Sequence, residues 1–118
     1  MITATIDSSS AVPPFEQLRS QLSAAINAGM LPTGTRLPSI RQIAGDLSLA
    51  PNTVARAYRA LEDAGLVEGR GRRGTVVTGG PDPAPAADLV GAAKTYLAEA
   101  TRLGLSREDA QIVLRLVG

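Results

Sequence analysis

The stretch that decides the fold runs from Gly34 to Thr78 and reads GTRLPSIRQIAGDLSLAPNTVARAYRALEDAGLVEGRGRRGTVVT. Two short amphipathic helices are expected in it, because apolar residues recur there at intervals of three and four. A tight turn separates the helices, and an arginine-rich hairpin follows them. This order of elements is that of a winged helix-turn-helix, whose second helix is shaped to lie in a DNA major groove.

The two helices have recognisable starts. Ser39 and Gln42 form a capping-box pattern before the first helix, and Pro51 suits the first position of the second. At 100° per residue, one side of the second helix is apolar and predicts a core contact: Val54, Ala57, Tyr58 and Leu61. The opposite side is polar and basic, with Asn52, Arg56 and Arg59. Strands are expected over residues 66–70 and 75–78, with the hairpin tip at 71–74.

On the N-terminal side, residues 1–12 are either a flexible arm or a short strand with Ile2, Ala4 and Ile6 alternating. A further helix is expected to begin at Pro13 or Pro14. Its buried stripe is predicted to consist of Phe15, Leu18, Leu22 and Ile26.

On the C-terminal side, the run of glycine and proline over residues 80–85 predicts a short linker. Two more helices are expected over residues 86–118, and they carry more apolar surface than one exposed helix needs. This segment is too short to enclose a metabolite cavity by itself, so it is interpreted as a dimerisation element. Its candidate dimerisation residues are Leu89, Ala93, Tyr96, Ala100, Leu103, Ile112, Val113 and Leu116. The predicted fold class is therefore α+β, mainly helical, with a winged helix-turn-helix over residues 1–79.

Composition excludes several classes of protein. The 118 residues include no cysteine and no histidine, so a disulfide framework, the usual zinc sites and Ser-His or Cys-His catalytic pairs are not expected. There is one lysine, Lys94, and no glycine-rich phosphate loop, so we expect neither an enzyme nor a bound cofactor or metal. No secretory signal and no membrane-spanning segment is visible, which favours the cytoplasm.

The net charge of +1 conceals an uneven distribution. Residues 34–78 carry seven arginines against four acids, a net charge of +3, whereas residues 1–33 and 79–118 each carry −1. Such clustering is what phosphate binding requires, although a solvated arginine-rich face would look the same.

The same residues resemble the GntR family of bacterial transcription regulators, and above all its small YtrA-type branch. The resemblance rests on four pieces of sequence: residues 14–18 (PFEQL), 34–39 (GTRLPS) with Arg41, 51–62 (PNTVARAYRALE), and the hairpin with 65–67 (GLV) and 71–77 (GRRGTVV). It implies a homodimer that binds a two-fold symmetric operator in double-stranded DNA, with two short C-terminal helices for dimerisation. Many relatives have a basic or hydroxyl residue where this chain has Ala50 and Pro51, so base contacts from these two positions are not expected.

The candidate DNA-binding residues are Arg36, Ser39, Arg41, Asn52, Thr53, Arg56, Arg59, Arg70, Arg72 and Arg73. Several have an alternative role. Arg41 could pair with Asp46 instead of a phosphate or a guanine, and Arg59 could pair with Glu62 or Asp63. Asn52 could cap its helix instead of contacting adenine, and Thr53 could bond local backbone. Arg72 and Arg73 suit backbone phosphates or a narrow minor groove, or form a solvated turn, and Arg70 flanks them.

The expected function is operator binding by a homodimer that represses transcription, because occupancy of a promoter is enough for repression. A winged-helix module that binds protein and not DNA is the alternative, and salt-dependent duplex binding would distinguish the two. A third hypothesis is the DNA-binding fragment of a larger regulator fused to an enzyme, and the size of the chain, with its own helices after the hairpin, argues against it. A small-molecule effector of unknown identity is left open as a further partner.

Overall fold

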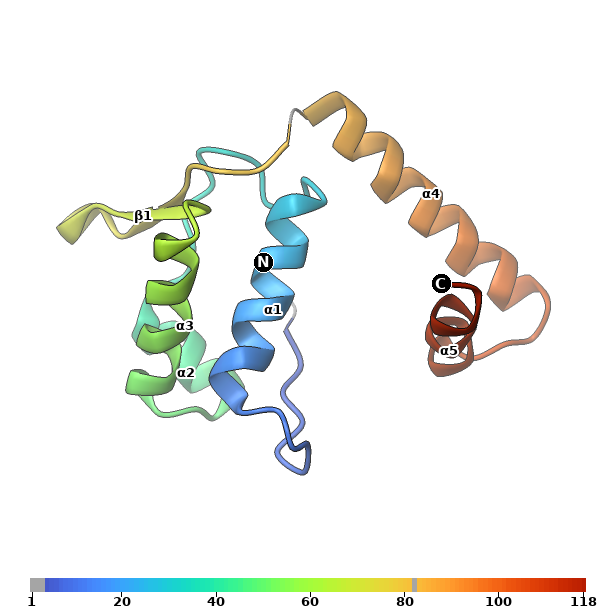
Figure 1. Cartoon of the computed structure of the whole chain (residues 1–118), viewed down its shortest axis with the longest axis horizontal. Coiled ribbons are helices and arrows are strands. Elements are labelled where there is room, and N and C mark those ends of the chain that lie inside the picture. The colour runs from blue at the N-terminus through green and yellow to red at the C-terminus, as the bar shows by residue number, and fades with distance from the viewer. Residues whose placement is uncertain (1–3, 82) are drawn as a thin grey trace.

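The computed structural model describes residues 4–81 and 83–118, which form five α-helices and one two-stranded sheet (Figure 1). The helices are α1 (Pro14–Asn27), α2 (Ile40–Leu47), α3 (Pro51–Asp63), α4 (Pro83–Arg102) and α5 (Arg107–Val117). The strands are β1 (Val67–Gly69) and β2 (Thr75–Val77), and a 3₁₀ turn, η1 (Gly71–Arg73), joins them. The fold is therefore mainly helical α+β, as the sequence predicts, although both strands are shorter than expected.

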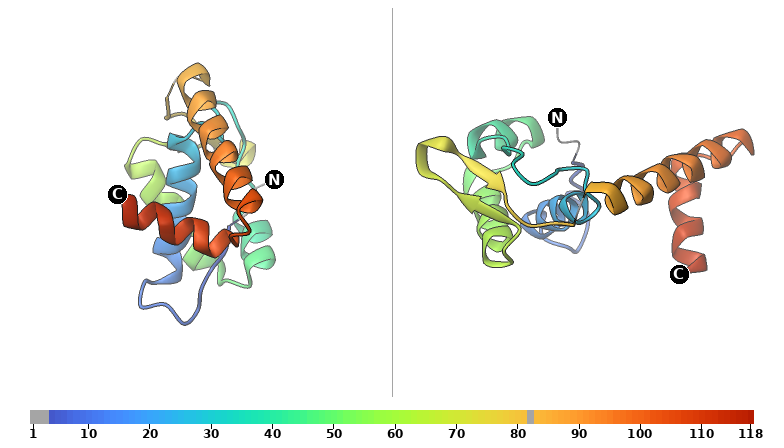
Figure 2. Two further views of the ribbon diagram at one scale, coloured as in Figure 1. Left: turned by 90° about the vertical axis from the view of Figure 1, so that its right-hand side faces the viewer. Right: turned by 90° about the horizontal axis from the view of Figure 1, so that it is seen from above.

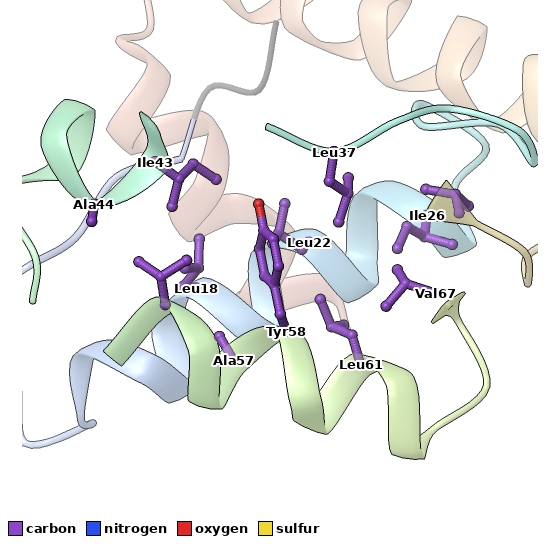
Figure 3. Packing of buried hydrophobic residues seen from close by; sticks show 12 residues of the cluster. Leu18, Leu22, Ile26, Leu37, Ile43, Ala44, Ala57, Tyr58, Leu61 and Val67 are labelled. Atoms are coloured by element: carbon purple, nitrogen blue, oxygen red, sulfur yellow. The ribbon is translucent and has the colours of Figure 1, made fainter. Parts of the chain in front are cut away.

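The hydrophobic core lies where α1, α2 and α3 meet (Figure 3). Its largest fully buried side chains are Leu18, Leu22 and Ile26 of α1, Val54 and Leu61 of α3, and Val77 of β2. Burying each such side chain contributes about 1.5–3 kcal/mol relative to leaving it exposed. The predicted stripes of α1 and α3 are confirmed, with one exception. Phe15 is only half-buried, because it lies at the start of α1 against Arg56 of α3 and outside this cluster.

The helix-turn-helix consists of α2, a three-residue turn and α3. The Ser39 hydroxyl accepts a hydrogen bond from the Gln42 N–H at 3.1 Å, which caps the start of α2. The return bond from the Gln42 side chain is not among the contacts of the described residues. Ser48 ends α2 in the left-handed conformation with φ 56°, and the Leu49 N–H then donates to the Ala44 carbonyl at 2.9 Å. These bonds set the angle at which α3 leaves α2.

The wing is an antiparallel hairpin in which Val67 pairs with Val77 and Gly69 with Thr75. A third segment, residues 34–37, lies along the other edge of β2. There the Leu37 N–H donates to the Thr75 carbonyl and the Val77 N–H to the Thr35 carbonyl, both at 2.8 Å. The backbone before α2 therefore holds the wing to the three-helix core.

Residues 4–12 form neither a free arm nor a paired strand, because two glutamine side chains of α1 hold the backbone of this segment. The Gln21 amide accepts from the Thr5 N–H at 2.9 Å and donates to the Thr5 carbonyl at 2.7 Å. The Gln17 amide likewise accepts from the Asp7 N–H at 2.8 Å and donates to the Asp7 carbonyl at 2.9 Å. Ala4 and Ile6 pack against the core as the alternation suggests, whereas Ile2 lies outside the described residues.

The predicted linker over residues 80–85 is too long, because α4 already begins at Pro83. The first N–H groups of a helix have no acceptor within it, so prolines at 83 and 85 are tolerated in the first turn. Among the linker positions, Asp82 lies outside the described residues.

None of the helices in the described part of the chain is long and apolar enough to cross a bilayer.

The C-terminal helices α4 and α5 pack on each other and extend away from the winged helix (Figures 1 and 2). Ala100 and Ala110 are buried, and the Tyr96 hydroxyl donates to the Ala110 carbonyl at 2.6 Å. A capping box of Ser106 and Asp109 starts α5. Large apolar side chains nevertheless stay exposed on this pair: Leu89, Leu103, Leu105, Ile112, Leu114, Leu116 and Val117.

Tyr58 provides a test of the helix packing. Its hydroxyl donates to the Pro38 carbonyl at 2.7 Å, and burial raises the pKa of Tyr58 from 10.0 to about 12. The Tyr58 hydroxyl therefore ionises at a lower pH in the unfolded chain than in the folded chain. This contribution to stability is complete below pH 10 and is lost as the pH rises towards 12.

We expect Tyr58→Phe to lower the free energy of unfolding by about 1 kcal/mol near neutral pH, because the Pro38 carbonyl loses its donor. Between about pH 10 and pH 12 the wild type should lose about 1.4 kcal/mol per pH unit more than the variant does. Urea unfolding across this pH range measures both effects. Equal pH dependence in the two proteins would contradict the buried tyrosine.

Candidate nucleic-acid interface

The free face of α3 carries the polar residues that the helical periodicity predicts. Asn52, Arg56 and Arg59 are exposed, and Thr53 is half-buried. The buried stripe of the same helix faces α1 and α2, so its packing fixes which side is presented to solvent. An amphipathic helix held in this way can enter a major groove with its polar side.

Two of the alternative roles on α3 do not occur. The helix starts at Pro51 with Ala50 as its N-cap, and no side chain caps it, so Asn52 does not fill that role. Among the described residues, the Thr53 hydroxyl makes no hydrogen bond to local backbone. The amide of Asn52 and the hydroxyl of Thr53 are therefore not engaged by neighbouring groups.

The predicted competing ion pairs are also not formed among the described residues. Neither Arg41 with Asp46 nor Arg59 with its acidic neighbours comes within bonding distance. Glu62 instead accepts from the Gly69 N–H at 2.7 Å, which ties the end of α3 to β1. Arg70 lies 3.7 Å from the Glu68 carboxylate, and this exposed pair flanks the wing.

Arg36 occupies a position that the sequence pattern alone does not explain. Its backbone bridges to Val76 of β2, and its guanidinium packs over Gly74. Gly74 has φ 80°, a conformation that favours glycine, and a Cβ there would lie 2.8 Å from the Arg36 Nε, so the guanidinium would have to shift to make room for one. Arg36 therefore lies along β2, with its guanidinium near the tip of the wing.

A hollow between α2 and the wing brings together residues from both elements. Ser39 and Arg41 line it from the start of α2, and Arg70 and Thr75 line it from the wing. Two guanidinium groups at one concave surface suit a backbone phosphate. Arg72 and Arg73 are exposed in η1 at the tip of the wing, which projects beyond the three helices (Figures 1 and 2).

Arg56 has a neighbour that the sequence reasoning missed. Its guanidinium carbon lies 3.7 Å from the centre of the Phe15 ring. The two residues are 41 positions apart in the sequence, so helical periodicity within either helix gives no signal for this contact.

Three packed helices, a two-stranded wing and a basic free face on the second helix of the helix-turn-helix define a winged helix-turn-helix DNA-binding protein. Residues 14–77 match the family described as bacterial regulatory proteins, gntR family. The chain therefore belongs to the GntR family, and it is a transcription regulator with a DNA-binding domain rather than an enzyme.

The curated relatives that share extended similarity with the chain include two regulators. It is 50% identical over 105 residues to the HTH-type transcriptional regulator Rv1152 of Mycobacterium tuberculosis, which covers 89% of this chain and 85% of that protein. It is 37% identical over 73 residues to the HTH-type transcriptional repressor YtrA of Bacillus subtilis, covering 62% and 56% respectively. The resemblance to YtrA-type regulators is thereby confirmed.

Solved structures of similar fold include the following two. YtrA from Sulfolobus acidocaldarius, a GntR-family transcription factor, superposes with a TM-score of 0.60 at 31% identity and covers 77% of this chain and 96% of that one. The DNA-binding domain of AraR in complex with operator ORE1 has a TM-score of 0.55 at 20% identity, covering 66% and 95%. The second likeness supports the winged-helix fold alone.

The wing can be tested by removing its two tip charges. We expect the double change Arg72→Ala and Arg73→Ala to weaken binding to duplexes of every sequence and to flatten the dependence of affinity on salt. Each lost phosphate contact lowers the slope of log affinity against log salt by about 0.9. Fluorescence anisotropy of labelled duplexes over a salt series measures both the affinity and this slope.

The matched control removes the same charge elsewhere, with Arg107→Ala and Arg115→Ala on α5. It should leave the slope unchanged. Loss of discrimination at one base position alone would mean that the wing reads sequence and not phosphate.

Proposed function

We propose that the chain binds a two-fold symmetric operator as a homodimer and represses transcription. The observation that carries the proposal is the free face of α3, where Asn52, Arg56 and Arg59 are displayed opposite the buried stripe. These side chains have the chemistry of direct readout, since arginine pairs with guanine and asparagine with adenine in the major groove.

The basic groups outside α3 supply the sequence-independent part of binding. Arg41 and Arg70 border the hollow between α2 and the wing. Arg72 and Arg73 lie at the tip of the wing. Contacts to phosphates from these positions would fix the register of α3 on the duplex without carrying sequence information.

The C-terminal helices support the dimer. Leu103 is 67% exposed and Leu116 is 78% exposed, and Leu89, Ala93 and Ile112 are also exposed. Of the remaining candidate dimerisation residues, Ala100 is buried, and Tyr96 and Val113 are half-buried. A second copy of the pair, related by a two-fold axis, would cover the exposed leucines and set the spacing of the two half-sites.

Repression is the simpler regulatory outcome, because an operator-bound dimer blocks a promoter by occupancy. Bacillus subtilis YtrA, which shares 37% identity over 73 residues, is named a transcriptional repressor. Activation would also require a surface that recruits polymerase, and no surface of the described residues suggests one.

The first test is a selection from random duplexes, followed by binding of the selected site at two salt concentrations. We expect a two-fold symmetric site with steep salt dependence, because two copies of α3 read two half-sites and the arginines displace counterions. A folded dimer that enriches no sequence and shows no salt-dependent duplex binding would instead be a protein-interaction module.

The dimer is tested by placing a charge on its proposed surface. Leu116→Glu should give a monomer in sedimentation velocity and weaken operator binding by about 100-fold, because the second half-site no longer binds intramolecularly. Gln111→Glu adds the same charge at an exposed polar position of α5 and should stay dimeric. A dimeric Leu116→Glu protein with full affinity would place the interface elsewhere.

A further inference from the structure

We propose that Phe15 is a positioning residue for DNA readout: its ring, on α1, holds the guanidinium of Arg56 on the free face of α3. This inference rests on the proposed operator binding. It adds a specificity-determining residue that belongs to neither the helix-turn-helix nor the wing.

The contact joins two neighbouring helices. The Arg56 guanidinium carbon lies 3.7 Å above the centre of the Phe15 ring, well inside the range of about 6 Å for cation–π attraction. Helices α1 and α3 lie side by side (Figure 1), and their packing brings the first turn of α1 beside the N-terminal half of α3. Phe15 is half-buried and Arg56 is exposed, so the ring is a fixed support for a side chain at the surface.

Stacking leaves the hydrogen-bonding capacity of Arg56 intact. The five N–H groups of a guanidinium point outward in its plane, so a ring that packs on its face leaves them able to donate. A carboxylate partner would instead occupy those N–H groups and compete with a base or a phosphate. The ion pairs of the described residues involve Arg19, Arg70 and Arg102, and none involves Arg56.

The acid nearest to Phe15 in the sequence is already engaged. Glu16 binds Arg19 through both carboxylate oxygens, and the Arg19 guanidinium lowers the pKa of that carboxyl. It therefore stays charged and paired within α1. Among the described residues, Arg56 therefore has an aromatic neighbour and no ion-pair partner, which is the arrangement expected of a guanidinium that must be ordered and still available.

The benefit for recognition is a smaller entropic cost. A free arginine side chain loses much of its rotamer freedom when it binds a base edge, whereas one already stacked on a ring loses less. Phe15 would therefore strengthen the contact that Arg56 makes with a specific base, and would leave binding to unrelated sequences unchanged.

The test is a double-mutant cycle on the selected operator and on a shuffled duplex. Phe15→Leu should lower operator affinity about threefold, the magnitude of an exposed cation–π contact, and should leave shuffled-duplex affinity unchanged. Phe15→Tyr keeps the ring and should restore wild-type affinity. Phe15→Met is a second ring-free variant of similar volume, in case the leucine protein fails to fold. In the Arg56→Ala background, removing the ring should have no further effect.

A base-substitution profile gives a readout that a purely structural role would not change. The base pair that loses discrimination in Arg56→Ala should also lose it partly in Phe15→Leu, and other positions should keep their preference. Two results would overturn the inference while wild-type binding still supports the proposed function. One is that removing the Phe15 ring lowers operator affinity equally in the presence and absence of Arg56. The other is that Phe15→Leu and Phe15→Met both keep wild-type affinity. A wild type that selects no operator would overturn both.

Discussion

The rest of the structure depends on the packing of α3 between α1 and α2. Val54 and Leu61 are fully buried there against Leu18 and Leu22 of α1, so α3 cannot rotate without exposing its apolar stripe. That single constraint decides which residues of α3 face solvent. The wing depends on the same helix, because the Glu62 carboxylate near its end accepts the Gly69 N–H of β1. DNA-reading geometry in this chain is therefore a consequence of core packing.

Local sequence patterns predicted the three core helices, because their signals lie within a few residues: intervals of three and four, Ser39 as a cap, and Pro51 at a helix start. They could not predict contacts between distant residues. Phe15 fits the periodicity of the α1 stripe, but its ring contacts the Arg56 guanidinium. The Gln21 amide is hydrogen-bonded to the backbone of Thr5, 16 residues away in the sequence. The sequence pattern overestimates the length of the linker, because proline is compatible with both a linker and a first helical turn. Gly45 lies inside α2 with open space where a Cβ would be, so packing against other parts of the described chain does not require a glycine there.

The seven arginines of residues 34–78 are alike in formal charge and unlike in their surroundings. Arg36 packs on the backbone of Gly74, Arg56 stacks on a ring, and Arg70 lies near Glu68. All seven are exposed, and the following four form no ion pair or ring contact among the described residues: Arg41, Arg59, Arg72 and Arg73. Net charge alone therefore does not measure DNA affinity here. A guanidinium fixed against glycine or a ring loses less entropy on binding than one in solvent, but it can reach fewer sites.

The connection between the winged helix and α4 begins at a fixed point. The Gly79 N–H donates to the Leu66 carbonyl at 3.1 Å, and a Cβ on Gly79 would lie 2.6 Å from the Gly65 carbonyl oxygen. Gly80, with φ 112°, lies against the Ile26 carbonyl. The chain is thus held to the winged helix up to Gly80, and α4 begins only three residues later. In the proposed dimer, this short connection would limit how far the two copies of α3 can move apart, so the C-terminal helices would determine half-site spacing through covalent geometry as well as through their own contact.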